Sequence, residues 1–209
     1  MCWRRTEPRL TGAGSWTDRV AGPWGAGLPG SDNEQDLVKK TVGLDGLEVR
    51  LIGFLQAVAG RGPVVNVANL LSTFGEHAAG WLLIGAGGAI VDARRRQTWV
   101  GLGAAAFTAH AAAVVIKRVV RRPRPDSPLI RVLDSTPSRL SFPSAHAAST
   151  TAAATMLAPL IGGPLAASVP VAMGAGRVLL GVHYPSDVLA GAGVGLLVGV
   201  VVRRYGMRS

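Results

Sequence analysis

The stretch FPSAHAASTTAAATMLAPLI, residues 142–161, places a serine and a histidine at the entrance to an apolar, alanine-rich run. Pro143 and Ser144 are residue types that commonly begin a helix, in its first turn and at its N-cap. A cap does not require the histidine, His146, that follows. The stretch therefore predicts a helix from residue 145 onward, whose beginning is either a simple cap or one edge of an active site.

The composition of the whole chain favours a membrane protein made of closely packed helices. Of its 209 residues, 48% are hydrophobic but only 5% are aromatic, and 28 are glycine. Small residues allow helix backbones to approach one another inside a bilayer. The single cysteine, Cys2, excludes a disulfide framework and a cysteine-based metal site. The formal net charge is +10, and almost all of the positive charge comes from arginine.

Two regions precede the long apolar segments. Residues 1–47 are rich in glycine, proline and charge and have no periodic apolar face, so we expect a disordered N-terminal extension. Residues 48–205 form the predicted membrane domain. Its first part, residues 48–75, has apolar residues at helical spacing and is interrupted at Gly60 and Pro63. Each half is too short and too polar to cross a bilayer. We expect two amphipathic helices at the membrane interface.

The remaining segments predict the fold class, an all-α, multi-pass membrane helical bundle with about five spans. The candidate spans are residues 78–91, 98–116, 145–161, 165–182 and 188–202. The last span carries Gly191, Gly195 and Gly199 at a four-residue spacing that is typical of close helix packing. Successive spans alternate in direction. The loop of residues 117–142, the start of the third span and the end of the fourth therefore reach the same membrane surface.

Three polar clusters would meet at that surface. The first is KRVVRRPRP, residues 117–125, whose prolines end any helix and favour an extended backbone. Its Lys117 and Arg124 could hold a phosphate, although a basic segment can also simply bind anionic lipid headgroups. The second is FPSAHA. An anion at the start of this helix would meet backbone N–H groups and the Ser144 hydroxyl, and His146 could transfer a proton.

The third cluster is GRVLLGVHYPSD, residues 176–187, which contains Arg177, His183 and Asp187. A carboxylate four residues after a histidine can bind one imidazole nitrogen and leave the other as a nucleophile or base. Arg177 could equally extend to the membrane surface from the end of a span, and Asp187 could cap a helix. Each cluster alone leaves both interpretations open.

Taken in order, the three clusters closely resemble the motifs of the type-2 phosphatidic acid phosphatase superfamily. The matching residues are Lys117, Arg124 and Pro125, then Pro143, Ser144 and His146, then Arg177, His183 and Asp187. The resemblance covers roughly residues 50–205. Two positions depart from the commonest pattern, because Ala145 replaces a glycine and Gly176 replaces a serine. Neither change removes a charged group of the motifs.

The resemblance implies a phosphatase that uses neither metal nor cofactor and forms a phosphohistidine. The residues expected to hold the phosphate are Lys117, Arg124, Ser144 and Arg177. His183 would attack phosphorus, and Asp187 would orient it. His146 would protonate the leaving oxygen and then activate water. The cations would do the electrostatic work that magnesium does in other phosphoryl-transfer enzymes.

The expected partner is a lipid-linked phosphate in the cell membrane, and no nucleic acid. The compact architecture and composition most resemble mycobacterial family members that act on decaprenylphosphoryl-5-phosphoribose, an arabinan precursor of the cell wall. A polyprenyl diphosphate and phosphatidylglycerol phosphate are the alternatives. The preferred substrate has a second phosphate, which we expect Arg131 or Arg139 to bind. The spare cations of the loop are Arg118, Arg121, Arg122, Arg131 and Arg139.

Two further interpretations can be weighed against a phosphatase. Vanadium haloperoxidases share the phosphate cradle, but they are soluble and much longer. A membrane anchor with a basic face for anionic lipid or nucleic acid would explain the arginines but not the two motif histidines and Asp187. Outside the motifs, His110 lies in an apolar span and is expected to be a buried, hydrogen-bonded histidine and not a catalytic one. Glu76 and His77 could line the site.

Overall fold

The computed structural model describes residues 44–136 and 138–206, so the predicted disorder of the N-terminal extension falls almost wholly outside this part. The described secondary structure is helical apart from one isolated bridge between Pro123 and Leu140. Short 3-10 helices, η2 (Glu76–Ala78) and η3 (Ala93–Arg95), precede α4 and α5. The α-helices are α2 (Leu44–Ala59), α3 (Pro63–Gly75), α4 (Ala79–Val91), α5 (Arg96–Val120), α6 (Ala145–Ile161), α7 (Gly163–Leu179) and α8 (Pro185–Tyr205). The predicted all-α class is confirmed.

Most helix boundaries lie close to the predicted ones, and the differences have local causes. α6 coincides with the predicted residues 145–161. α2 begins at Leu44, inside the predicted extension, because leucines recur at helical spacing from that point. α7 ends at Leu179, earlier than predicted, because the chain turns at Gly181 with a φ of 72°. Glycine adopts this left-handed conformation without steric cost.

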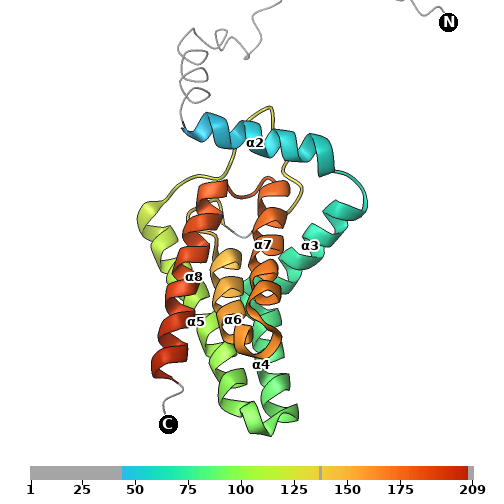
Figure 1. Ribbon diagram of the computed structural model, residues 1–209. Coiled ribbons are helices and arrows are strands. Elements are labelled where there is room, and N and C mark those ends of the chain that lie inside the picture. The colour runs from blue at the N-terminus through green and yellow to red at the C-terminus, as the bar shows by residue number, and fades with distance from the viewer. Residues whose placement is uncertain (1–43, 137, 207–209) are drawn as a thin grey trace, which may run out of the picture. The chain divides into compact units, whose positions relative to one another are not determined.

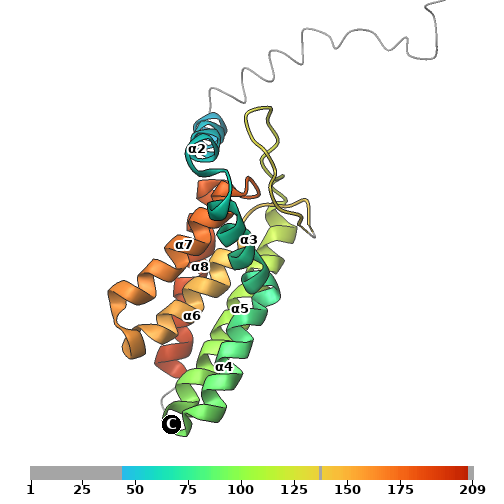
Figure 2. The same cartoon turned by 90° about the vertical axis from the view of Figure 1, so that its right-hand side faces the viewer.

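α6 lies in the middle of the bundle, and α5, α7 and α8 pack around it (Figures 1 and 2). α4 lies along α5. α2 crosses one end of the bundle, near the loop of residues 121–144 and the turn between α7 and α8. This end, called the α2 end below, is where the sequence predicted that the polar clusters meet.

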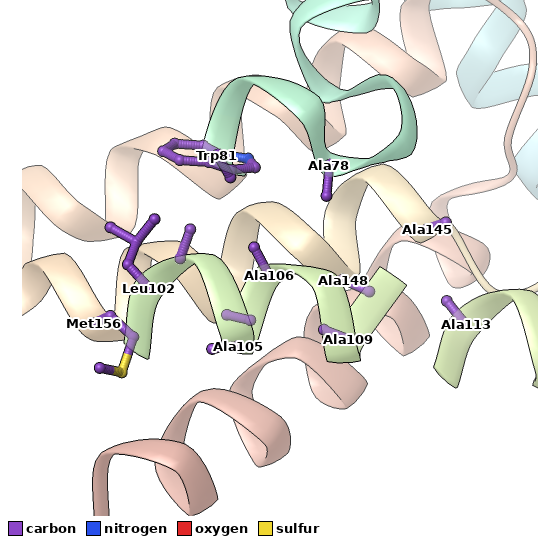
Figure 3. Close-up of a cluster of buried hydrophobic side chains, with 12 residues drawn as sticks. Ala78, Trp81, Leu102, Ala105, Ala106, Ala109, Ala113, Ala145, Ala148 and Met156 are labelled. Atoms are coloured by element: carbon purple, nitrogen blue, oxygen red, sulfur yellow. The ribbon is translucent and has the colours of Figure 1, made fainter. Parts of the chain in front are cut away.

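The core between α5 and α6 is built mainly from alanine (Figure 3). Its buried alanines are Ala105, Ala106, Ala109, Ala113, Ala145, Ala148, Ala152 and Ala153. Trp81 of α4 packs against this core, and its Nε1 donates a hydrogen bond of 3.0 Å to Oγ1 of Thr150. Short side chains let the helices approach closely, so that many small dispersion contacts replace large interlocking side chains.

α8 packs on α6 through the glycine stripe predicted from the sequence. A Cβ added to Gly195 would collide with the carbonyl of Ala148 and would lie 2.9 Å from Cβ of Thr151. Gly193 of the same helix has open space around it. The buried glycines of this contact, called the α6–α8 seam, are Gly191, Gly195 and Gly199. Their predicted role in close packing is confirmed.

Two described segments are long and apolar enough to cross a bilayer, as judged by length and composition alone. They are residues 93–120, which comprise η3 and α5, and residues 185–205, which are α8. Large apolar side chains also lie exposed on the outside of the bundle, among them Phe107, Leu189 and Leu197. An apolar exterior of this kind marks a surface that contacts lipid or another protein.

Candidate active site

A cavity of about 1450 Å³ lies at the α2 end of the bundle. Its walls come from α3, η2, α5 and the loop of residues 121–144, and the end of α7 and the start of α6 complete it. The predicted site residues that line it are Lys117, Arg124, His146, Arg177 and His183. The other two, Ser144 and Asp187, are fully buried and do not reach the cavity. The fold thus gathers residues of all three motifs around one space.

The first motif lies where α5 ends. Lys117 is in the last turn of this helix and is only 8% exposed. The helix stops because Arg121 takes a left-handed conformation with a φ of 56°, and Pro123 cannot continue a helix. Pro123 then pairs with Leu140, so the chain turns back toward the start of α6. This turn places Arg124 opposite the loop between α7 and α8.

Arg124 is held by backbone carbonyls on both sides. Its Nε donates to the carbonyl of Ser138 at 2.7 Å, and its Nη1 donates to the carbonyl of Val182 at 2.5 Å. The same Nη1 lies 3.5 Å from Nε2 of His183. Burial and the charge of Arg177 lower the pKa of Arg124 to about 10, so it stays positively charged at neutral pH.

Ser144, a predicted phosphate-binding residue, does not line the cavity. It is the N-cap of α6, and its Oγ accepts the N–H of Ala147 at 3.4 Å. Ser144 is fully buried, and its hydroxyl orders the helix terminus. Ala145 and His146 do line the cavity. The N–H groups at the start of a helix attract an anion even without a hydroxyl.

His146 is held by α3. Its Nε2 lies 3.0 Å from the carbonyl oxygen of Ser72. A carbonyl only accepts hydrogen bonds, which assigns the hydrogen to Nε2 and leaves Nδ1 to exchange a proton with a ligand. The ring also lies tightly against α3, because a Cβ added to Gly75 would be 2.6 Å from Cδ2 of His146.

Arg177 is fixed by two residues that the sequence analysis missed. Its Nη1 donates to Oγ of Ser72 and, at 2.8 Å, to Oδ2 of Asp134. Oγ of Ser72 itself donates to Oδ2 of Asp134 at 2.6 Å. Nε of Arg177 is buried and has no hydrogen-bond partner among the described residues. One side of the guanidinium is therefore anchored, and another side offers a donor that suits an anion.

His183 lies in the turn between α7 and α8 and is 1% exposed. Its Nδ1 is 3.6 Å from Oδ2 of Asp187, which leaves Nε2 beside Arg124. Burial, followed by the charges of Arg124 and Arg177, holds the pKa of His183 well below its usual value. The imidazole is therefore neutral at pH 7, as a nucleophilic nitrogen must be.

Asp187 is held in turn by Arg122, which the sequence analysis treated as a spare cation. Nη1 of Arg122 donates to Oδ1 of Asp187 at 2.9 Å, and its Nη2 donates to Oε2 of Glu48 at 2.8 Å. The N–H of Tyr184 donates to Oδ2 of Asp187 at 2.8 Å. Through Glu48, α2 thereby helps to fix the carboxylate beside His183.

Two histidines outside the motifs also line the cavity. The rings of His77 and His110 are 5.9 Å apart. Nδ1 of His110 is buried with no hydrogen-bond partner in the described part of the chain. His77 and Ala78 have φ values of 51° and 60°, which are uncommon for residues with side chains and cluster at functional sites. The prediction of a buried, hydrogen-bonded His110 is therefore wrong for Nδ1, and the residue forms part of the cavity wall.

Positive charge dominates the side of the cavity next to His183, where Lys117, Arg124 and Arg177 meet. Asp134 is the acidic partner of Arg177 there. Within residues 44–136 and 138–206, no group of three or more histidine, cysteine or acidic side chains is placed to hold a metal ion. The arrangement can hold a phosphate between three cations, a neutral imidazole and a second histidine.

Residues 98–209 match the model of the PAP2 superfamily, which is more than half of the chain. The chain belongs to the PAP2 superfamily. Two similar proteins are each named decaprenylphosphoryl-5-phosphoribose phosphatase. The one from Mycolicibacterium smegmatis is 54% identical over 70% of this chain and 81% of its own length. The one from Mycobacterium tuberculosis is 50% identical over 75% of this chain and 88% of its own length.

Two solved structures share the PAP2 fold. A transmembrane PAP2-type phosphatidylglycerolphosphate phosphatase from Bacillus subtilis has a TM-score of 0.58 at 23% identity and covers 75% of this chain and 85% of its own. LpxE from Aquifex aeolicus has a TM-score of 0.55 at 23% identity and covers 73% of this chain and 93% of its own. At this identity the likeness extends to the fold alone.

Apart from Arg122, the residues that hold the motif side chains in place lie outside the motifs. Ser72 and Glu48 lie in helices far from the motifs along the chain. No signal in the sequence distinguished Ser72, because α3 also carries Asn66, Asn69 and Thr73. Asp134 is an acidic residue in a strongly basic loop, which is a signal for a specific ion pair.

Proposed function

We propose that this protein hydrolyses the 5-phosphate of decaprenylphosphoryl-5-phosphoribose, a phosphomonoester on a membrane lipid, to give decaprenylphosphoryl-ribose for arabinan precursor synthesis in the cell wall. The observation that carries the proposal is the single cavity in which Lys117, Arg124 and Arg177 meet beside His183. The names of the two relatives at 54% and 50% identity support the choice of substrate.

In the first step, the three cations hold the phosphate, and Nε2 of His183 attacks phosphorus. The bond between phosphorus and the sugar oxygen breaks. His146, which enters this step as the imidazolium with a hydrogen on both ring nitrogens, delivers the proton of Nδ1 to that oxygen. The cations stabilise the charge spread over the phosphoryl oxygens. Asp187, 3.6 Å from Nδ1 of His183, stabilises the positive charge that forms on the ring. The product is a phosphohistidine.

In the second step, water replaces the sugar alcohol. His146, now neutral, takes a proton from the water while its oxygen attacks phosphorus. The phosphorus–nitrogen bond breaks, inorganic phosphate forms, and His183 returns to its neutral state. Because His146 takes up the proton that it gave in the first step, one histidine is both acid and base in a complete cycle.

We also propose a multi-pass arrangement in the cell membrane. In it, α4 to α8 are about five spans, and α2 and α3 lie at the interface, so that residues 48–205 with the first turn of α2 form the phosphatase domain. The apolar side chains on the outside of the bundle support this arrangement. The cavity at the α2 end would then lie at headgroup depth, where a lipid phosphate is found.

An assay of the purified protein in detergent tests the function. The panel is the phosphoribosyl lipid, a polyprenyl diphosphate and phosphatidylglycerol phosphate, with His183→Gln as the inactive control. We expect phosphate release to be fastest, by kcat/KM, from the phosphoribosyl lipid and absent in the variant. Faster release from the diphosphate would instead identify an enzyme that recycles the lipid carrier.

The proposed chemistry assigns the work of a metal ion to side chains, and it can be tested with chelators. Phosphate release should persist in excess EDTA and should be inhibited by vanadate, which resembles the five-coordinate transition state. Loss of activity in EDTA that magnesium restores would contradict the roles given to Lys117, Arg124 and Arg177.

A further inference from the structure

Two arginines outside the motifs lie in the wall of the active-site cavity. Arg118 follows Lys117 directly, and Arg121 ends α5. Both side chains are exposed, whereas Lys117 is buried. Arg121 is the C-cap of this helix, and its Nε donates a hydrogen bond of 3.1 Å to the carbonyl oxygen of Arg118, which holds the two residues together. Arg118 and Arg121 therefore form a positive pair at the outer part of the cavity, next to the cradle for the reacting phosphate.

The other spare cations of the loop do not line the cavity, which argues against the prediction that Arg131 or Arg139 binds the second phosphate. Arg122 donates to Asp187 and Glu48. Nη2 of Arg131 donates to the carbonyl of Gly60 at 3.1 Å, and neither Arg131 nor Arg139 lines the cavity. Sequence position in a basic loop could not distinguish these arginines, because the distinction depends on how the loop folds.

An apolar strip continues from this pair along α5. Ala111, Val114 and Val115 line the same cavity, and the Val115 side chain is 63% exposed. The strip and the arginines thus offer an apolar track beside a positive pair. A polyprenyl chain joined to a phosphodiester has the same two parts in the same order. In the proposed substrate, one ribose separates that phosphodiester from the phosphate that is removed.

We propose that Arg118 and Arg121 form a second anion site, which binds the phosphodiester of a polyprenyl-linked sugar phosphate while the terminal phosphate occupies the catalytic cradle. The inference rests on the proposed function for its substrate. The acidic groups in the cavity do not oppose it directly, because Asp134 is paired with Arg177 and Glu76 lies beside His77. The site would select a substrate with two separated charges over one with adjacent phosphates.

The test varies the charge on the enzyme and on the substrate together. The two substrates are the phosphoribosyl lipid and an analogue in which a neutral ether replaces the phosphodiester, both in uncharged detergent. Arg118→Gln and Arg121→Gln should each raise KM for the phosphodiester roughly 3- to 10-fold, because a charged contact at a wet surface is weak. KM for the neutral analogue and kcat for both substrates should stay unchanged.

Arg131→Gln and Arg139→Gln are the matched controls, since they remove the same charge from the loop that follows α5, outside the cavity. They should leave KM unchanged for both substrates. Equal effects of the Arg118 and Arg121 changes on both substrates, or no effect on either, would overturn the second anion site and leave the proposed function intact. Failure of the unmodified protein to hydrolyse the phosphoribosyl lipid would overturn the function itself.

Discussion

The two sides of α6 differ in how closely they are packed. Toward α8, the glycines of the α6–α8 seam bring backbones into contact and leave no space for a Cβ. Toward α3 and α5, the start of α6 borders a cavity of about 1450 Å³ lined by charged and histidine side chains. The seam therefore fixes the backbone, whereas the cavity exposes charged and histidine side chains.

The seam also positions side chains that line the cavity. The N–H of Ser144 donates to the carbonyl of Asp187 at 2.9 Å, which joins the start of α6 to the start of α8. A Cβ added to Gly191 would meet the carbonyl of Ser144. His146 and His183 are thus set relative to each other by backbone contacts. Changes in the cavity should affect activity, and changes in the seam should affect folding first.

The largest effect is expected from Arg124→Gln. Loss of one phosphate-binding cation should lower kcat/KM roughly 10²- to 10³-fold. Removing a positive neighbour also raises the pKa of His183, because the imidazolium is less repelled. The acidic limb of the kcat/KM profile should therefore move to higher pH. An unchanged acidic limb would mean that Arg124 does not act on His183, and thermal unfolding checks that the variant is folded.

The seam is tested by two substitutions in one helix. Gly195→Ala should destabilise the protein by about 1–3 kcal/mol, because the added methyl collides with α6. Gly193→Ala, where the space is open, should be neutral or slightly stabilising, since alanine favours a helix. Thermal unfolding in detergent measures both. Equal unfolding temperatures for the two variants would show that the seam is not closely packed.

A smaller effect is expected where α2 supports the active site. Glu48→Gln removes the ion pair with Arg122 and loosens Asp187, so kcat should fall roughly 3- to 10-fold while KM changes little. Glu48→Asp should restore part of the loss. The control is Arg50→Gln, an exposed position in the same helix. A change confined to KM would indicate that α2 contacts the substrate and does not position the nucleophile.

The smallest effect is expected at the far side of the cavity. His110→Phe removes the buried Nδ1 that could bind a sugar hydroxyl, and KM for the phosphoribosyl lipid should rise roughly 2- to 5-fold. His110→Asn, which keeps a hydrogen-bonding group, should be closer to the unmodified protein. Hydrolysis of a polyprenyl diphosphate, which has no sugar, provides the comparison and should be unaffected by either substitution.

Local signals in the sequence predicted the parts of this site that local chemistry decides. Pro123 ends α5 and turns the backbone at Arg124, and Pro143 with Ser144 begins α6 where predicted. The order of the motifs and the alternation of helices then predicted that Arg177 and His183 would join them. These inferences needed only the direction of the chain and the length of each helix.

Contacts between distant segments could not be predicted in the same way. Ser72 reaches Arg177 because α3 packs on α7, and Glu48 reaches Arg122 because α2 crosses the end of the bundle. The burial of Ser144 also depends on the packing of α8 beside it. Motif spacing identifies residues that touch a substrate, whereas the residues that hold them are determined by tertiary packing.

The most direct test of the account is to trap the covalent intermediate. His146→Ala should still allow attack by His183 on ³²P-labelled p-nitrophenyl phosphate, whose leaving group needs no proton, but should slow attack by water. We predict that labelled phosphate accumulates on His183, stable in base and labile in acid, and that peptide mapping assigns it to this residue. Label on another residue, or continued turnover with no labelled protein at any time, would contradict the central claim that His183 is the nucleophile of this site.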